Sequence, residues 1–140
     1  MIIEKLNISQ IQQLFELIQK LQWPRSMDEL KIMIKKSMSF ALIEPISEKL
    51  IGYTRVLTDE VKYAFIFNVI VDEDYQKLGL GRVQMEAVIS HPKLKKIQNF
   101  ELTCSPAMKG FYEKFGFSRE YMSAEFGEVI PLRFQRLVNE

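Results

Sequence analysis

The chain has 140 residues, 47% of them hydrophobic and 26% charged, which is the size and composition of one globular domain with a buried core. Nineteen Lys and Arg residues nearly balance eighteen Asp and Glu residues, which excludes a global field that would attract nucleic acid or an anionic membrane. Its single cysteine, Cys104, excludes an intramolecular disulfide, and no apolar run approaches the roughly 18 residues of a membrane span. The first residues also lack the basic-then-apolar pattern of a signal peptide. We therefore expect one domain over residues 1–140 in a soluble, cytoplasmic protein without nucleic-acid or membrane partners.

The first elements predicted are a strand and a helix. Residues 2–7 read as a short apolar strand. Ser9, followed three residues later by Gln12, is typical of a capping box that opens a helix. Apolar residues then recur at helical spacing until Trp23-Pro24, which should end the helix because proline removes a backbone donor.

A second helix and three strands should follow. Ser26 with Glu29 repeats the capping signal, and the apolar stripe of this helix extends to Met38. The predicted strands are residues 39–46, 49–58 and 61–71. Because only short turns join them, we expect an antiparallel meander.

Two more helices alternate with strands in the rest of the chain. Apolar spacing predicts a helix over residues 80–90, a buried strand at 100–104 and a helix over 107–115. Gly116 suits the left-handed residue that closes a helix. The residues from Phe117 onward are expected to add a strand.

Between the meander and its following helix lies the segment QKLGLG, residues 76–81. A strand, a G-x-G turn and a helix direct several backbone N–H groups at one point, where the helix dipole also favours negative charge. A plain helix start is the alternative interpretation of a lone G-x-G. A dinucleotide-binding motif would require a third glycine where Gln84 stands, and the G-x-x-x-x-G-K-[ST] of a phosphate-binding loop is absent from the sequence.

Two motifs together identify a resemblance. Gln76-Lys77-Leu78-Gly79-Leu80-Gly81 matches the pattern [RQ]-x-x-G-x-[GA], and YEKFGF, from Tyr112 to Phe117, follows about 35 residues later. With the predicted order β-α-α-β-β-β-α-β-α-β, the chain resembles the GNAT superfamily of acyl-CoA-dependent N-acetyltransferases, and within it a branch of small bacterial members. The resemblance implies an α+β fold with a mixed sheet whose central strands splay apart.

The resemblance also implies a binding mode for acetyl-CoA as co-substrate, with no metal. Backbone groups of the loop would hold the pyrophosphate, and the Lys77 and Arg82 side chains would be its charge partners. The pantetheine arm would lie along Val71, beside a splayed strand 100–104, and the N–H of Val69 would polarise the thioester carbonyl. Tyr112 would protonate the departing sulfur. The loop residues concerned are Gln76, Lys77, Leu78, Gly79, Leu80, Gly81 and Arg82.

The helix that carries Tyr112 should turn Met108, Phe111 and Phe115 toward the core, which leaves Tyr112 at the edge of the apolar stripe. A tyrosine that only packs in the core is the alternative.

The acceptor side departs from the family pattern. Phe65 and Phe67 occupy positions where members with a recognisable general base often carry Glu or His. Asn68 could orient the acceptor, and Trp23 could border the acceptor cleft. Glu101 is a weak candidate for the general base, and a water chain is an equal one.

The expected function is therefore acetyl transfer to a primary amine of a small molecule or peptide. The alternatives are a non-catalytic acyl-CoA-binding or sensing module and a nucleotide-binding domain of another class. A homodimer is compatible with the resemblance.

Overall fold

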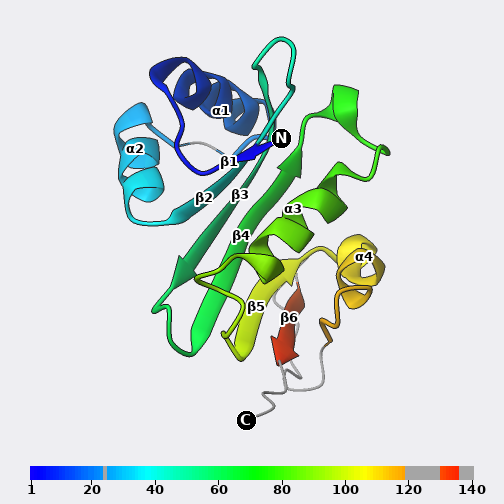
Figure 1. The fold of residues 1–140 in the computed structure, drawn as a ribbon. Coiled ribbons are helices and arrows are strands. Elements are labelled where there is room, and N and C mark those ends of the chain that lie inside the picture. Colours follow the sequence, from blue (N-terminus) through cyan, green and yellow to red (C-terminus); the bar gives the residue numbers. More distant parts are fainter. Residues whose placement is uncertain (24, 119–129, 136–140) are drawn as a thin grey trace. The chain divides into compact units, whose positions relative to one another are not determined.

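The computed structural model describes residues 1–23, 25–118 and 130–135 (Figure 1). Its elements in chain order are β1 (Ile2–Ile3), α1 (Ile8–Lys20), α2 (Met27–Lys35), β2 (Met38–Ile43), β3 (Leu50–Thr58), β4 (Tyr63–Val71), η1 (Glu73–Tyr75), α3 (Leu80–Ser90), β5 (Asn99–Cys104), η2 (Pro106–Met108), α4 (Lys109–Glu113) and β6 (Ile130–Gln135). Apart from the two 3-10 turns η1 and η2, this is the predicted order. Among these residues no helix is long and apolar enough to cross a membrane.

The strands form a mixed sheet in the order β1-β2-β3-β4-β5-β6. β1 with β2, β2 with β3 and β5 with β6 pair in antiparallel fashion, whereas β4 and β5 pair in parallel. The parallel register joins Tyr63 to Asn99 and Phe65 to Glu101. The mixed α/β fold predicted from the sequence is thus confirmed, and the splaying of β5 from β4 beyond this register stays a prediction.

Two compact units make up the chain. The first consists of residues 1–56 and 68–88, and the second of residues 57–67 and 89–140. The glycine loop, residues 76–81, and the carboxyl half of β4 belong to the first unit. Tyr112 and the amino half of β4 belong to the second. The prediction that residues 1–140 form one functional domain stays a prediction.

Helices α1 and α2 bury their apolar stripes against one face of the sheet in the first unit. The hydrophobic side chains that meet there come from both helices and from three strands, and burying them is the main force that holds this unit together. They are Leu14, Leu17, Ile18, Leu30, Ala41, Ile43, Leu50, Tyr53 and Ile70.

Helix α3 covers the other face of the sheet in the first unit (Figure 1). Ala41 and Tyr53 belong to the cluster under α1 and α2, so their neighbours Leu42 and Gly52 point the opposite way, because successive residues of a strand alternate between faces. A Cβ atom built on Gly52 would lie 3.0 Å from the Nε2 of Gln84, on α3. The loop before α3 is therefore tied to a helix packed directly on the sheet.

The capping box predicted for α1 at Ser9 and Gln12 is wrong by two residues. Asn7 is the N-cap: its side chain accepts from the N–H of Gln10 at 2.8 Å, and the Gln10 side chain accepts from the N–H of Asn7 at 3.0 Å. Asparagine caps as well as serine does, and the Asn7–Gln10 pair starts the helix two residues before the predicted box.

The caps of α2 follow the prediction at one end only. Ser26 and Glu29 form the reciprocal box that begins this helix. Met38, predicted to continue its apolar stripe, instead begins β2, because the helix ends at Lys35.

Aromatic rings build the core of the second unit. The Phe117 and Phe134 ring centroids lie 5.7 Å apart, and Phe100 packs on Phe134 at 6.0 Å. Gly116, with φ +93°, is the left-handed residue after α4: its N–H bonds to the carbonyl of Glu113, and the next N–H reaches back to Tyr112. The predicted role of Gly116 is therefore confirmed, although α4 ends at Glu113 instead of residue 115.

Candidate active site

The glycine loop has a backbone suited to an anion. Lys77 and Gly79 both have positive φ, +65° and +76°, so left-handed residues flank Leu78. Alternation of this kind gathers successive N–H groups on one concave side. The first hydrogen bond of α3 runs from the N–H of Val83 to the carbonyl of Gly79 at 3.3 Å. The N–H groups of the preceding three residues consequently have no acceptor within the helix.

Open space surrounds this backbone. A Cβ atom on Gly79 would meet no atom of the described residues within 4 Å, and the side chains of Lys77 and Leu78 are exposed. A bulky phosphate can therefore approach the backbone without displacing the protein. The loop thus fits the diphosphate of CoA by its backbone conformation and by its access to solvent.

The side chains of the loop behave differently from the expectation. Arg82, expected to pair with phosphate, forms an i, i+4 ion pair with Glu86 at 2.8 Å. Both side chains are largely exposed, so the pair is weak and can exchange for a ligand. The Gln76 side chain donates through Nε2 to the carbonyl of Val71 at 3.0 Å, which ties the start of the loop to the end of β4.

The carboxyl half of β4 carries the other residues of the first unit whose backbone is expected to contact the acyl carrier. Val69 and Val71, predicted to contact the thioester and the pantetheine arm, are half-buried residues of this strand. Leu80 and Gly81, in the first turn of α3, are half-buried as well. Asn68 belongs to the same strand, and its side chain lies outside the described part of the structure.

Tyr112 lies in the second unit and is buried, with 6% of its surface exposed. Burial raises the pKa of its phenol to about 12, and the nearby Cys104 thiol adds to the effect. Its ring makes edge contacts with Phe111 and Phe117 at centroid distances of 5.0 and 6.2 Å. A phenol held neutral in this way is a proton donor over the whole physiological pH range.

The predicted orientation of α4 is wrong. Met108, expected in the core, is 42% exposed, and Phe111 and Phe115 are only half-buried, whereas Tyr112 is the buried residue of the helix. The reason is that Met108 belongs to the 3-10 turn η2, so the helical period that the prediction extended back to it begins only at Lys109.

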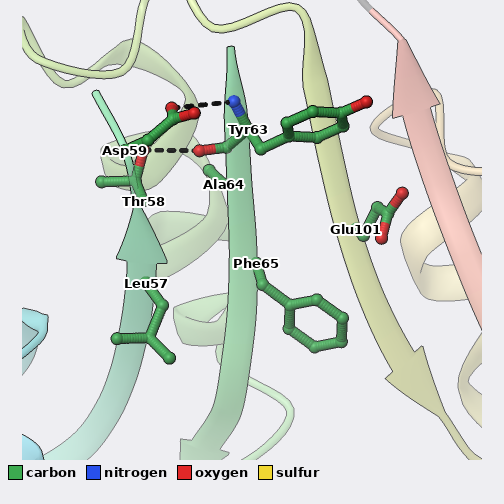
Figure 2. Close-up of a pocket in the computed structure, with 7 residues that line it drawn as sticks. All are labelled: Leu57, Thr58, Asp59, Tyr63, Ala64, Phe65 and Glu101. Carbon is green, nitrogen blue, oxygen red and sulfur yellow. Dashed lines mark hydrogen bonds between the residues drawn. The ribbon is translucent and has the colours of Figure 1, made fainter. Parts of the chain in front are cut away.

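A cavity of about 440 Å³, open to solvent, lies in the second unit beside the turn of the β3–β4 hairpin (Figure 2). Apolar side chains dominate its lining, and the Phe65 ring stacks on Phe67 with centroids 4.5 Å apart. The residues around it are Leu57, Thr58, Asp59, Tyr63, Ala64, Phe65 and Glu101.

The Thr58 and Asp59 side chains of this cavity already have partners. The Thr58 hydroxyl donates to the carbonyl of Tyr63 at 2.6 Å, and the Asp59 carboxylate accepts the N–H of Tyr63 at 3.1 Å, as Figure 2 shows. Backbone hydrogen bonds, the first from Lys62, hold the pKa of Asp59 below its ordinary value. These groups fix the hairpin turn and leave an apolar surface for a ligand.

Glu101, a weak candidate for the general base, lines the cavity and forms an ion pair with Arg133 of β6. Both side chains are about a quarter exposed. The carboxylate that was the candidate base is therefore engaged by a guanidinium. The sequence analysis missed Arg133, because only the β5–β6 register, Glu101 opposite Arg133, brings the two together. Trp23, the other acceptor candidate, belongs to the first unit, is 45% exposed and is not among the residues of the cavity.

Comparisons with known proteins agree on one family. The model of the acetyltransferase (GNAT) family matches residues 8–117. A GCN5-related N-acetyltransferase 1, chloroplastic, from Arabidopsis thaliana is 33% identical over 117 residues, which cover 81% of this chain and 57% of the relative. An uncharacterized N-acetyltransferase, ycf52, of Pyropia yezoensis is 28% identical over 120 residues, which cover 84% of this chain and 68% of the relative.

A solved structure agrees in fold. The aminoglycoside 6'-N-acetyltransferase complexed with coenzyme A matches with a TM-score of 0.83 and 14% identity, over 100% of this chain and 99% of that one.

Proposed function

Because the chain belongs to the GNAT family of acetyltransferases and is an acyl-transferring enzyme, we propose that it moves the acetyl group of acetyl-CoA to a primary amine within a ternary complex. The observation that carries the proposal is the bare, left-handed backbone at Lys77 and Gly79 ahead of α3, which suits a diphosphate. The solved relative in fold that holds coenzyme A supports the choice of carrier.

In the proposed reaction the amine nitrogen attacks the thioester carbon, a C–N bond forms and the C–S bond breaks. The N–H of Val69 would donate to the thioester oxygen as negative charge develops there. Tyr112 would give its proton to the departing sulfur, and its phenolate, with a pKa of about 12, would recover a proton from solvent. The amine loses its proton to water, since Glu101 is held by Arg133.

For the acceptor we infer an amine attached to an apolar body. The cavity beside Phe65 and Leu57 supports this inference, because its two carboxylates and the Thr58 hydroxyl are engaged within the protein and apolar side chains dominate the rest of its lining. A strongly polar acceptor would find few uncommitted partners there.

Calorimetric titration with acetyl-CoA, CoA and ATP tests the carrier. We expect binding of the two CoA compounds and none of ATP. Gly79→Ala should weaken acetyl-CoA binding about tenfold or more, because alanine in a left-handed backbone costs roughly 1–2 kcal/mol and the loop relaxes to avoid it.

Gly110→Ala is the matched control. Gly110 lies within α4, has open space around it and has no positive φ, so alanine should keep the affinity and add stability. Equal affinity of the parent and Gly79→Ala would contradict the assignment of the loop. Binding of acetyl-CoA with no release of CoA in the presence of amines would favour the non-catalytic module instead.

A further inference from the structure

Helix α3 carries a glutamine that is completely buried. Gln84 is 0% exposed, next to Met85 and near Val88 on the buried side of the helix, where an apolar residue would be expected. Its Nε2 donates to the carbonyl of Ile70 on β4 at 3.1 Å. Its Oε1 is buried and has no hydrogen-bond partner among the described residues.

This glutamine is a poor choice for stability alone. Burying an amide whose oxygen has no partner costs free energy, whereas methionine has a similar length and fills such a space without a polar atom. What the amide supplies and methionine cannot is the single hydrogen bond to Ile70. The function of Gln84 therefore has to be sought at that carbonyl.

The carbonyl of Ile70 turns toward α3 through a gap left by a glycine. A Cβ on Gly52 would lie 2.8 Å from the Ile70 oxygen and 3.0 Å from the Nε2 of Gln84. The Ile70 oxygen therefore lies beside Gly52 of β3, within reach of the Gln84 amide of α3. The next carbonyl, that of Val71, accepts from the Gln76 amide. Two glutamines from the segment after β4 thus hold two successive carbonyls at its end.

The peptide bond between Ile70 and Val71 links the carbonyl held by Gln84 to the N–H of Val71. The carbonyl of Ile70 and the N–H of Val71 belong to one rigid plane and point in opposite directions. Holding the oxygen toward α3 therefore aims the Val71 N–H away from α3. We propose that Gln84 is a positioning residue that sets the Val71 N–H for the pantetheine arm of the acyl carrier, an inference that rests on the proposed function.

Gln84→Met tests this on one preparation. The variant removes the donor and the orphan oxygen but keeps the volume, so we expect an equal or higher thermal midpoint, a Kd for acetyl-CoA raised about tenfold and a raised KM. Gln10→Met is the matched control. Gln10 is also buried but serves the capping box of α1, so this variant should lower the thermal midpoint and leave the Kd unchanged. A lower midpoint with unchanged Kd for Gln84→Met would overturn the proposal.

Gly52→Ala places a methyl group directly against the same carbonyl and the Gln84 amide. We expect it to weaken acetyl-CoA binding too, and the double variant Gly52→Ala/Gln84→Met to show less than the sum of the two effects, because both act through one peptide. Full additivity would contradict the proposal.

The amide signal of Val71 in a ¹⁵N NMR spectrum gives a readout that needs no acyl carrier. Gln84→Met should shift it and Gln10→Met should not. A parent that binds no acetyl-CoA would refute the proposed function while this signal still tests Gln84, and an unmoved signal would refute the role of Gln84.

Discussion

Tyr112, proposed as the proton donor to the thiolate, is at the same time the buried residue of α4. It is buried, so its phenol stays neutral with a pKa raised to about 12, and it retains a proton that solvent cannot readily remove. Burial also gives the ring a packing role against Phe111 and Phe117. The two roles separate when only the hydroxyl is removed.

Tyr112→Phe should lower turnover by roughly 10²-fold, the low end for the loss of a general acid, and leave acetyl-CoA affinity nearly unchanged. The phenylalanine ring keeps the packing. Initial rates, Kd and thermal midpoint on one preparation provide the comparison, and the absence of a pre-steady-state burst in the parent shows that chemistry limits its rate. An unchanged rate would remove Tyr112 from the mechanism.

The pH dependence of stability gives an independent check on the same residue. Because the pKa of Tyr112 is raised in the folded state, the neutral phenol contributes stability fully below the unfolded pKa of about 10, and this contribution is lost as pH rises toward 12. Tyr53 behaves in the same direction, since burial raises its pKa as well. Urea unfolding across this range should show a shallower loss for Tyr112→Phe than for the parent, and parallel curves would contradict the raised pKa.

Individual residues differ in how far the sequence reveals them. Gly79 and Gly116 are recognisable because a left-handed backbone strongly favours glycine, and the structure confirms positive φ at both. Arg133 and Gln84 cannot be recognised in this way. Arg133 bonds to Glu101, 32 residues away, through the register of two strands, and Gln84 bonds to Ile70, 14 residues away, through the packing of a helix on the sheet. Gln84 entered the sequence analysis only as the missing third glycine of another motif.

At the scale of elements, order was predictable and exact boundaries were not. The alternation of apolar segments and turn residues gave every strand and helix in sequence, because each must bury one face. Boundaries depended on the choice between adjacent caps, as at Asn7 and Ser9, and on a 3-10 turn at Met108 that the helical period cannot signal. The strand and helix around the glycine loop were predicted closely, as residues 61–71 and 80–90 against the observed Tyr63–Val71 and Leu80–Ser90.

The corrected cap of α1 can be measured. Asn7→Ala should lower the free energy of unfolding by about 1 kcal/mol, because the N–H of Gln10 loses its acceptor. Ser9→Ala is the matched control: Ser9 accepts only an exposed bond from Gln13 at 3.3 Å, so its loss should change stability by much less. Urea denaturation of both variants decides the point, and a larger cost at Ser9 would restore the sequence-based cap.

At the scale of the whole molecule, the near-neutral charge indicates that an anionic ligand has to bind at a local site. With 19 basic and 18 acidic residues, the chain has no global field that would attract an anionic carrier, so the proposed carrier has to be held by a local site. The family and fold followed from two short motifs in the correct elements, and the match over residues 8–117 bears this out. The acceptor could not be inferred with equal sharpness, because the cavity that supports an apolar amine is formed by side chains from three strands brought together only by folding.

The central claim is that the chain transfers an acetyl group from acetyl-CoA to an amine. The most direct measurement supplies acetyl-CoA with an isotopically heavy acetyl group together with phenethylamine, tryptamine, spermidine or glucosamine, and detects the products by mass spectrometry. We predict a heavy acetyl group on the amine, an equal amount of free CoA and faster transfer to the two aromatic amines than to the two polar ones. Acetyl-CoA that binds but yields no acetylated amine with any of the four would contradict the account.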